Sequence, residues 1–418
     1  MKMVRTTTGS GAAAIAALTD RRTIPYERVL PEARRIVEAV RRGGDAALLR
    51  LRAKHDGISP QLPLRITDAE LEEAWETTPE PLRKAMRLAA GNIRGFAARQ
   101  RPKDFTLKPA VGLTTGQRVI PLASAGCYVP SGRYPLPSTL LMTVIPAQVA
   151  GVDRIVAVSP HPKKEALAVA ALLGVKEFYR VGGAHGIAAL AYGTESIPRV
   201  DKIAGPGNVW VTAAKKLIAF DCAIDMLAGP TEIVVTSEGG DPTGIAADLV
   251  AQAEHDPDAL TIFITSQVKL AKEVVGEVKR RMRGNQIATA AITNHGVAIV
   301  TRSQEEAWEL TNRIAPEHLT VDSVEDLAWA HNAGSVFVGR WSSQPLGDYV
   351  SGPNHTLPTG GLARVRGGLS VVDFVKLVTV QEYSEEGVQQ LGPAAMRLAH
   401  AEGLMGHAEA IRARGAHD

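Results

Sequence analysis

The sequence predicts an α/β fold with two parallel-sheet domains. After Val119, short apolar runs alternate with amphipathic segments, which is the pattern of parallel strands joined by helices. The runs fall into one group before about Gly229 and another after it, although no repeat in the sequence relates the two groups. We therefore expect strands at 154–159, 177–181, 232–236, 260–265 and 297–301.

Length, composition and charge favour a soluble globular protein that acts on small molecules. A chain of 418 residues with 45% hydrophobic residues buries a large core and suggests two or three domains. The 47 Lys and Arg residues nearly balance 44 Asp and Glu residues, and no basic run indicates a nucleic-acid or membrane surface. No segment has the roughly 20 consecutive apolar residues that a membrane span needs. We therefore expect neither nucleic acid nor a membrane as a partner.

Helical segments are predicted toward both ends of the chain. Residues 1–22 carry too weak an apolar stretch for a signal peptide, so we interpret them as an N-terminal arm or helix. The rest of the first third is helical, with apolar residues at helical spacing across 82–96. A last helical segment begins at Gln381. Its apolar stripe across 398–411 suits packing on the same subunit or on another one.

The two cysteines, Cys127 and Cys222, lie far apart and form no Cys-x-x-Cys spacing. Neither a disulfide framework nor a thiolate zinc site is therefore indicated. A reducing cytoplasm is the expected compartment.

Two glycine-rich turns are candidates for close approach to a ligand. One spans 182–186, directly after an expected strand, and the other spans 205–208. Neither matches the Gly-x-Gly-x-x-Gly dinucleotide pattern, no phosphate-binding P-loop is present, and tight strand-to-helix turns explain these glycines equally well. Tyr128 lies in another turn-like stretch. It is either an aromatic platform for a flat ligand or a core residue.

Glu317 and His318 place a carboxylate and an imidazole side by side, and these two bases have different ordinary pKa values. A helix predicted to begin with the capping box of Ser303 and Glu306 ends before Pro316, so the pair lies at a helix-to-strand junction. Such a pair can serve two separate proton transfers, and it is also what a solvated surface loop contains.

A metal site is the second candidate for chemistry. Gln252 and His255 lie three residues apart on the inward face of a helix predicted over 243–255. Zinc accepts imidazole nitrogen and carboxylate oxygen, and a Gln carbonyl oxygen can also bind a borderline cation. Further donors occur later in the chain: Asp348, His355, Glu402 and His407. Alternatively, His255 is a hydrogen-bonded core histidine, Asp348 is a turn-forming aspartate and His407 is a solvated helix residue.

Several long motifs occur in one order along the chain. They are Gly126-Cys127-Tyr128-Val129-Pro130, Pro137-Ser138-Thr139, Gly205-Pro206-Gly207-Asn208, Ile224-Asp225-Met226, Ala228-Gly229-Pro230, Gln252-Ala253-Glu254-His255, Pro316-Glu317-His318-Leu319, Ala333-Gly334-Ser335-Val336-Phe337 and Gly352-Pro353-Asn354-His355. With these motifs the chain resembles the histidinol dehydrogenase family over nearly its whole length. The resemblance implies oxidation of L-histidinol through an aldehyde to L-histidine, the last two steps of histidine biosynthesis, with two NAD and one zinc ion per subunit.

The resemblance also implies an arrangement of domains. Residues 1–18 are an N-terminal arm, 19–127 and 231–369 form an α/β domain with most of the zinc and catalytic residues, 128–230 form an inserted NAD-binding domain, and 370–418 are a helical tail. Both sheet domains are then incomplete Rossmann-like domains. In this family the tail reaches the partner subunit, so an intertwined homodimer is expected in which each tail completes the other subunit's site.

The family's functional positions match this sequence residue by residue. Glu317 and His318 match the paired proton acceptors. The positions of the zinc ligands are Gln252, His255, Asp348 and His407. The positions that contact NAD are Tyr128, His185 and Asn208. The positions that contact the substrate or its zinc are Thr231, Gln252, His255, His318, Asp348, His355, Glu402 and His407.

Two positions depart from the family pattern. His185 stands where the family usually has Gln, and Thr231 stands where it usually has Ser. Both residues keep hydrogen-bonding ability, but His changes the shape and the choice of tautomer. Three alternatives remain: a related zinc and NAD dehydrogenase for another amino alcohol or a polyol such as sulfopropanediol, a different dehydrogenase, and a non-catalytic metal- or nucleotide-binding protein.

Overall fold

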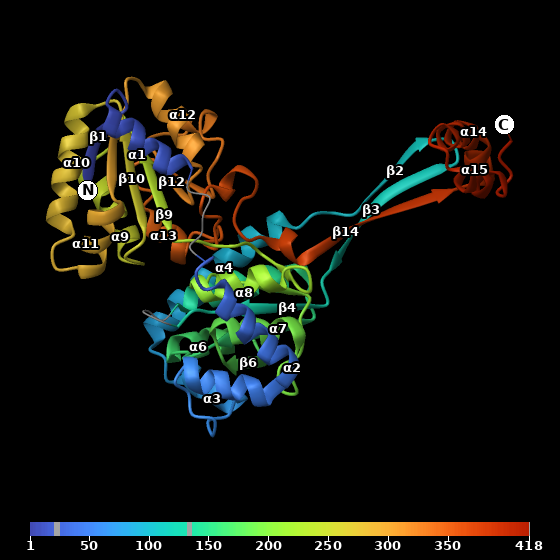
Figure 1. Ribbon diagram of the computed structural model, residues 1–418, viewed down its shortest axis with the longest axis horizontal. Helices are drawn as coiled ribbons and strands as arrows, with labels where there is room; N and C mark the ends of the chain where they lie inside the picture. The colour runs from blue at the N-terminus through green and yellow to red at the C-terminus, as the bar shows by residue number, and fades with distance from the viewer. Residues whose placement is uncertain (21–25, 132–135, 418) are drawn as a thin grey trace.

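The computed structural model describes residues 1–20, 26–131 and 136–417, and this part of the chain forms three sheets. Two are parallel sheets covered by helices, and the third is an antiparallel ribbon that projects away from them and carries the C-terminal helices (Figure 1). The predicted α/β class with parallel sheets and a helical C-terminal end is confirmed. No helix in the described ranges combines the length and the apolar character needed to cross a lipid bilayer.

The six-stranded parallel sheet has the strand order β1-β11-β10-β9-β12-β13. Phe263 of β10 points into a core beneath α9, α10 and α11, whereas Ile262 and Ile264 point into a core beneath α12 and α1. Burial on both faces explains why this strand is a continuous apolar run. The strands are β1 (Lys2–Arg5), β9 (Glu232–Thr236), β10 (Leu260–Thr265), β11 (Val297–Val300), β12 (His318–Val321) and β13 (Ser335–Val338). The helices are α1 (Gly9–Thr19), α9 (Pro242–Ala253), α10 (Val268–Arg281), α11 (Gln286–His295), α12 (Gln304–Ile314) and α13 (Gln344–Tyr349).

The first residues of the chain are the edge strand of this sheet, which corrects the prediction of a separate arm over 1–18. β1 pairs in parallel with β11, with Lys2 opposite Val297. α1 confirms the helical part of the prediction and packs beside α12. A strand of four residues is too short to show an alternating pattern, so the sequence did not reveal it.

The five-stranded parallel sheet has the strand order β6-β5-β4-β7-β8, so its order reverses direction between β4 and β7. Val156 and Val158 of β5 point toward α7 and α8, whereas Ala157 points toward α5 and α6. The strands are β4 (Ser124–Tyr128), β5 (Arg154–Ser159), β6 (Glu177–Arg180), β7 (Lys202–Ala204) and β8 (Ala223–Ile224). The helices are α5 (Pro137–Ala150), α6 (Lys164–Leu172), α7 (Gly183–Tyr192) and α8 (Val209–Ile218).

Three helices from the first third of the chain enclose the five-stranded sheet, which differs from the predicted grouping of 19–127 with 231–369. They are α2 (Leu30–His55), α3 (Asp68–Glu76) and α4 (Glu80–Gln100). α2 packs on α7 and α8, α3 on α6, and α4 on α5. Leu48 of α2 shares a core with Leu190, and Ile93 of α4 shares one with Phe178. A helical stripe predicts that a face is buried but not which sheet buries it.

The projecting arm is built from both halves of the chain. Its strands are β2 (Phe105–Ala110), β3 (Leu113–Pro121) and β14 (Val375–Tyr383), in the antiparallel order β14-β3-β2. At its end lie α14 (Glu385–Ala401) and α15 (Met405–Arg412), which share a small core around Met396 and Ala408 (Figure 1). The predicted helical tail over 370–418 is therefore wrong for 375–383. That segment forms a strand because it pairs with β3, residue for residue, from Val375 to Tyr383.

Short 3-10 helices complete the connections. They are η1 (Glu325–Ala328), η2 (Leu362–Arg364) and η3 (Val371–Phe374).

Candidate active site

The helix-to-strand junction predicted for the two bases is confirmed. α12 begins after Ser303, whose side chain accepts a hydrogen bond from the backbone N–H of Glu306 at 3.3 Å. It ends at Ala315, whose φ of 51° lies in the left-handed region that non-glycine residues rarely adopt. Pro316 then prevents the helix from continuing, and β12 starts at His318.

Glu317 is held at the amino edge of the six-stranded sheet. Its Oε2 accepts hydrogen bonds from Thr231 Oγ1 at 2.6 Å and from the backbone N–H of Glu232 at 2.8 Å. Both donors lie at the start of β9, which pairs with β12 in the sheet. Glu317 and His318 are only 7% and 3% exposed, so the pair is not part of a solvated surface loop.

His318 has one ring nitrogen engaged and one nitrogen available. Nδ1 lies 3.0 Å from the carbonyl oxygen of Glu232, so it donates its proton there. Nε2 is 3.7 Å from Asp348 Oδ1 and has no hydrogen-bond partner among the described residues. Burial lowers the pKa of His318, but the carboxylates of Glu317 and Asp348 outweigh burial and raise that pKa to about 10. Nε2 is therefore the atom that can exchange a proton with a ligand.

Gln252 is oriented by Thr231. The Thr231 hydroxyl has one proton, which it donates to Glu317, so it accepts its other hydrogen bond from Gln252 Nε2. The amide oxygen Oε1 of Gln252 then faces away from Thr231. This oxygen is buried and has no hydrogen-bond partner in the described part of the chain. A buried oxygen without a partner is costly, so Oε1 fits a position that binds a cation or another ligand.

Asp348 lies close to two histidines of the predicted site, His318 and His355. Its Oδ2 accepts a hydrogen bond from Gln344 Nε2 at 2.6 Å, and its carbonyl oxygen accepts one from His355 Nδ1 at 2.9 Å. Burial raises the pKa of Asp348, but His318, together with His355 and His255, outweighs burial and lowers that pKa. α13, which carries Asp348, packs against α9, which carries Gln252. The structure thus brings Gln252, Asp348 and their neighbours to one edge of the sheet.

His255 differs from its predicted inward position. It follows the end of α9 and is exposed, with Nδ1 3.2 Å from the carbonyl oxygen of Ala251. The alternative of a core histidine is therefore excluded. Its charge lowers the pKa of Asp348, though less than that of His318 does.

Glu402 and His407 lie far from this cluster within one chain. Glu402 ends α14 and His407 is on α15, at the far end of the projecting arm (Figure 1). Both side chains are exposed. The ranges that the structure describes contain no group of three or more His, Cys, Asp and Glu side chains placed to hold a metal ion. Within one chain, Gln252 and Asp348 lie on helices that pack together and His255 follows Gln252 by three residues, whereas the predicted fourth ligand lies at the end of the arm.

The three positions predicted to contact NAD gather at the carboxyl edge of the five-stranded sheet. Tyr128 ends β4, His185 is in the first turn of α7, and Asn208 is the N-cap of α8. The hydroxyl of Tyr128 accepts a hydrogen bond from Gly183 N at 3.1 Å, and Asn208 Oδ1 accepts from the first N–H groups of α8. In open parallel sheets, ligands bind beyond the carboxyl ends of strands where the strand order reverses, as it does here between β4 and β7.

His185 faces inward at this edge. It is buried, and its Nε2 lies 2.8 Å from Asp56 Oδ2. The same carboxylate oxygen accepts a hydrogen bond from Gly182 N at 3.1 Å, so Asp56 and His185 together hold the turn before α7. Asp56 is missing from the predicted site because it follows a helix end rich in charged residues, where nothing distinguishes it from a solvated side chain.

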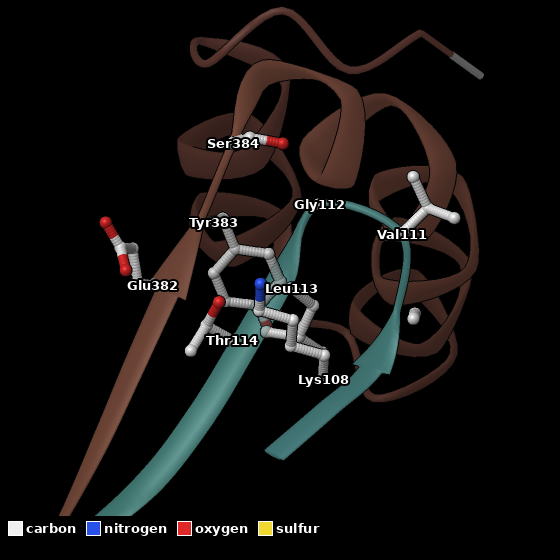
Figure 2. A pocket seen from close by; sticks show the side chains of 9 residues that line it. Lys108, Val111, Gly112, Leu113, Thr114, Glu382, Tyr383 and Ser384 are labelled. Carbon is white, nitrogen blue, oxygen red and sulfur yellow. The ribbon is translucent and has the colours of Figure 1, made fainter. Parts of the chain in front are cut away.

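A separate cavity of about 530 Å³ lies at the end of the arm. Figure 2 shows it between the turn at Val111 and Gly112 and the end of β14 at Tyr383. None of the predicted site residues lines it, so the candidate active site remains at the sheet edges.

Comparisons with known proteins agree with one another. A family model described as histidinol dehydrogenase matches residues 19–415. A histidinol dehydrogenase of Geobacillus kaustophilus is 47% identical over 392 residues, which cover 91% of this chain and 92% of that protein. One from Synechococcus sp. is 45% identical over 396 residues, which cover 91% of each. A crystal structure of histidinol dehydrogenase from Elizabethkingia anophelis matches with a TM-score of 0.91 and 32% identity, over 99% of this chain and 98% of that chain.

Proposed function

Because the chain belongs to the histidinol dehydrogenase family, whose members oxidise histidinol in histidine biosynthesis, we propose that it catalyses the complete four-electron oxidation of L-histidinol, through bound L-histidinal, to L-histidine. The observation that supports this most is the meeting of two buried bases, Glu317 and His318, with the unpaired Gln252 Oε1 and Asp348 at one sheet edge. An oxidation in two steps involves proton transfers from the alcohol, from water and from the hydrate, and the two bases at this edge can divide them.

One zinc ion per subunit is part of the proposal, with Gln252, His255, Asp348 and His407 as its ligands. The donor set of one amide oxygen, one carboxylate and two imidazoles suits zinc. The buried Oε1 of Gln252 supports the assignment, because a cation satisfies an oxygen for which the described residues supply no hydrogen-bond partner. When bound, the zinc ion orients the imidazole and the amino group of histidinol. His355, which donates to the carbonyl oxygen of Asp348, is proposed to contact the substrate from the same loop.

NAD is proposed to bind at the carboxyl edge of the five-stranded sheet. Tyr128 ends β4 and Asn208 follows β7, and the strand order reverses between these two strands, an arrangement that favours a nucleotide there. In this proposal His185 affects NAD binding mainly through Asp56, because His185 binds Asp56 and Asp56 holds the turn before α7.

His318 is proposed to serve the first oxidation. Its Nε2 takes the proton of the alcohol while the carbinol carbon loses a hydride to NAD. A pKa of about 10 would keep the imidazole protonated at neutral pH. A cation held by Asp348 would weaken the attraction between that carboxylate and the imidazolium and would lower the pKa of His318.

Glu317 is proposed to serve the second oxidation. It takes a proton from the water that attacks the aldehyde carbon, while His318 returns the proton of the alcohol to the aldehyde oxygen. The resulting hydrate then gives a hydride to a second NAD and a hydroxyl proton to the neutral His318. Thr231 and Glu232 both donate to Oε2, so Oε1 is the oxygen that we expect to face the water. An aldehyde that stays bound between the two steps does not react elsewhere.

An intertwined homodimer is also proposed. Glu402 and His407 lie at the end of an arm that leads away from the other site residues, so a second copy of the chain must supply them if they take part (Figure 1). Large apolar surfaces on a projecting arm favour burial against a partner. Exposed apolar side chains of the arm and tail include Phe105, Leu107, Leu377, Val380, Leu398 and Met405.

The stoichiometry of NADH tests the proposed reaction. We expect about two NADH per histidinol consumed, because both oxidations occur before release. Incubation with a chelator is expected to abolish turnover, and added zinc to restore it. One NADH per histidinol would contradict the coupled second oxidation. Normal turnover after complete removal of the metal would contradict the zinc site, and NADH from sulfopropanediol but not from histidinol would favour the related polyol dehydrogenase.

Thr231→Val is expected to weaken zinc binding by about tenfold to a hundredfold. Valine keeps the shape of threonine but removes the hydroxyl that orients both Gln252 and Glu317. Titration of the metal-free protein with zinc measures the effect. Thr231→Ser, which keeps the hydroxyl, is the matched control and should bind zinc about as tightly as the unchanged protein. Equal affinity for zinc in the Val and Ser variants would show that Gln252 needs no such orientation.

A cytoplasmic location is the last part of the proposal, and the state of the cysteines agrees with it. Cys127 and Cys222 are free and buried, and burial raises the pKa of each thiol to about 12. We expect iodoacetamide at about pH 8 to leave the native protein unlabelled and to label both thiols after unfolding in urea, as measured by mass spectrometry. Rapid labelling of the native protein would mean that one of the thiols becomes exposed in solution.

A further inference from the structure

Lys215 and Asp225 form a buried ion pair that has no part in the proton transfers or the zinc site. Lys215 lies on α8 and Asp225 directly follows β8. Lys215 Nζ is 2.6 Å from Asp225 Oδ1, and the two side chains are 4% and 1% exposed. Apolar side chains of similar size are often as stabilising as a buried ion pair, because both charges must be removed from water. A contribution to stability therefore does not explain why a charged pair is buried here, and the contacts that the pair makes indicate its role.

Both charged groups bind the backbone of Gly205. Lys215 Nζ donates to the carbonyl oxygen of Gly205 at 2.6 Å, and Asp225 Oδ2 accepts from its N–H at 2.8 Å. Asp225 Oδ1 also accepts from the backbone N–H of Met226 at 2.6 Å. The pair thus satisfies both backbone polar groups of one buried residue and fixes the peptide on each side of it.

Gly205 begins the loop of residues 205–208 at the reversal of strand order. Its φ of 122° is accessible to glycine and rarely to other residues. An added Cβ would lie 2.2 Å from Tyr128 O, so the loop is packed directly on the end of β4. Three residues later Asn208 caps α8, the helix that carries Lys215. The ion pair therefore ties Gly205, which is packed on Tyr128, to the last turn of α8 and to the segment after β8.

We infer that Lys215 and Asp225 are positioning residues that hold the 205–208 loop in the conformation that binds NAD. The inference rests on the proposed NAD site. Without the pair, the backbone groups of Gly205 lose their partners and the loop samples several conformations. The apparent affinity for NAD then falls in proportion to the fraction of molecules whose loop is correctly placed. The zinc and histidinol site, on the other sheet, is not affected.

The double variant Lys215→Met/Asp225→Leu tests the inference in the full-length, zinc-loaded enzyme. It removes both charges together and so avoids a single buried, unpaired charge, which endangers the fold most. We expect the Kd and the KM for NAD to rise by about tenfold or more. The kcat at saturating NAD, the zinc content and the KM for histidinol should stay within about threefold of the unchanged enzyme.

A second variant and a control complete the experiment. Lys215→Met/Asp225→Asn is also neutral but keeps an acceptor for the N–H of Gly205, so we expect it to recover part of the NAD affinity. It also provides the measurement if the first variant does not fold. Lys216→Met makes the same change one position along α8, where Nζ contacts Tyr26 and Glu27 instead of the loop. NAD affinity is expected to be unchanged in that control.

The outcomes separate this inference from the proposed function. If calorimetry finds no binding of NAD to the unchanged enzyme, the proposed NAD site itself fails. If the unchanged enzyme binds NAD and the folded double variants bind it equally well, the positioning role is wrong. A parallel loss of affinity for NAD, zinc and histidinol would also overturn the inference, because it would indicate a general structural role.

Discussion

Glu317→Gln is expected to block the oxidation of histidinal while leaving the interconversion of histidinol and histidinal nearly intact. Glutamine keeps the size of Glu317 and an acceptor for Thr231 and Glu232, but an amide cannot take a proton from water. With histidinal and NAD, the rate should fall by about a hundredfold to a thousandfold. With histidinal and NADH, where no water reacts, the rate of reduction should stay within about threefold.

His318→Asn is expected to slow both reactions, because the proposed mechanism uses Nε2 in each. A loss of about a thousandfold in kcat is expected with histidinol and with histidinal. Exposed residues nearby supply matched controls: Glu309→Gln on α12 and His331→Asn should leave both rates unchanged. Normal rates for Glu317→Gln and His318→Asn with both substrates would contradict the division of roles. A large loss for Glu317→Gln in the reduction as well would assign that residue to the alcohol proton instead.

Mixing two inactive variants is expected to restore activity if the tail completes a partner's site. We call the two parallel-sheet domains of a chain its body and the helices at the end of the arm its tail. His318→Asn removes a site residue of the body, and His407→Asn removes one of the tail. In a mixed dimer, the undamaged body of one chain meets the undamaged tail of the other, so one of the two sites is intact. If chains pair at random, half of the dimers are mixed, and each mixed dimer has one intact site out of two. About a quarter of the activity of the unchanged enzyme should therefore return. Co-expression with two affinity tags allows the mixed dimer to be purified and assayed.

The complementation experiment has its own control. Combining His318→Asn with Glu317→Gln puts both defects in the body, so no intact site forms and the formation of histidine should not return. Restored activity in the first mixture and none in the second would locate His407 in the partner's site. A mixed dimer that forms but stays inactive in the first mixture would mean that body and tail act within one chain, contrary to the proposal.

The amino-acid sequence was sufficient for much of the fold. The expected strands at 154–159, 232–236 and 260–265 are confirmed with their boundaries, and the junction at Pro316 was visible in the pattern of a capped helix followed by proline. These features are local. Apolar runs, caps and helix breakers act over a few residues, so each segment carries its own signal.

The same local signals explain what the sequence left undecided. The apolar stripes of α2 and α4 predicted burial, but the five-stranded sheet was selected by contacts with residues such as Leu190 and Phe178, which are far away in the chain. The segment 375–383 became a strand only through pairing with β3. Pairing partners that are distant in sequence leave no mark on the segment itself.

For the candidate site, the sequence by itself determined which residues can do chemistry: a carboxylate and an imidazole at 317 and 318, oxygen and nitrogen donors later in the chain, and the motifs that resemble one family. Only the tertiary structure decided that Thr231 and Glu232 hold Glu317, that Gln252 Oε1 has no partner among residues 1–20, 26–131 and 136–417, and that His407 lies at the end of an arm. The reason is geometric. Parallel pairing of β9 with β12 brings residues more than 80 positions apart within hydrogen-bond distance, as the Glu232 to Glu317 contact shows, and spacing along the chain does not encode that register.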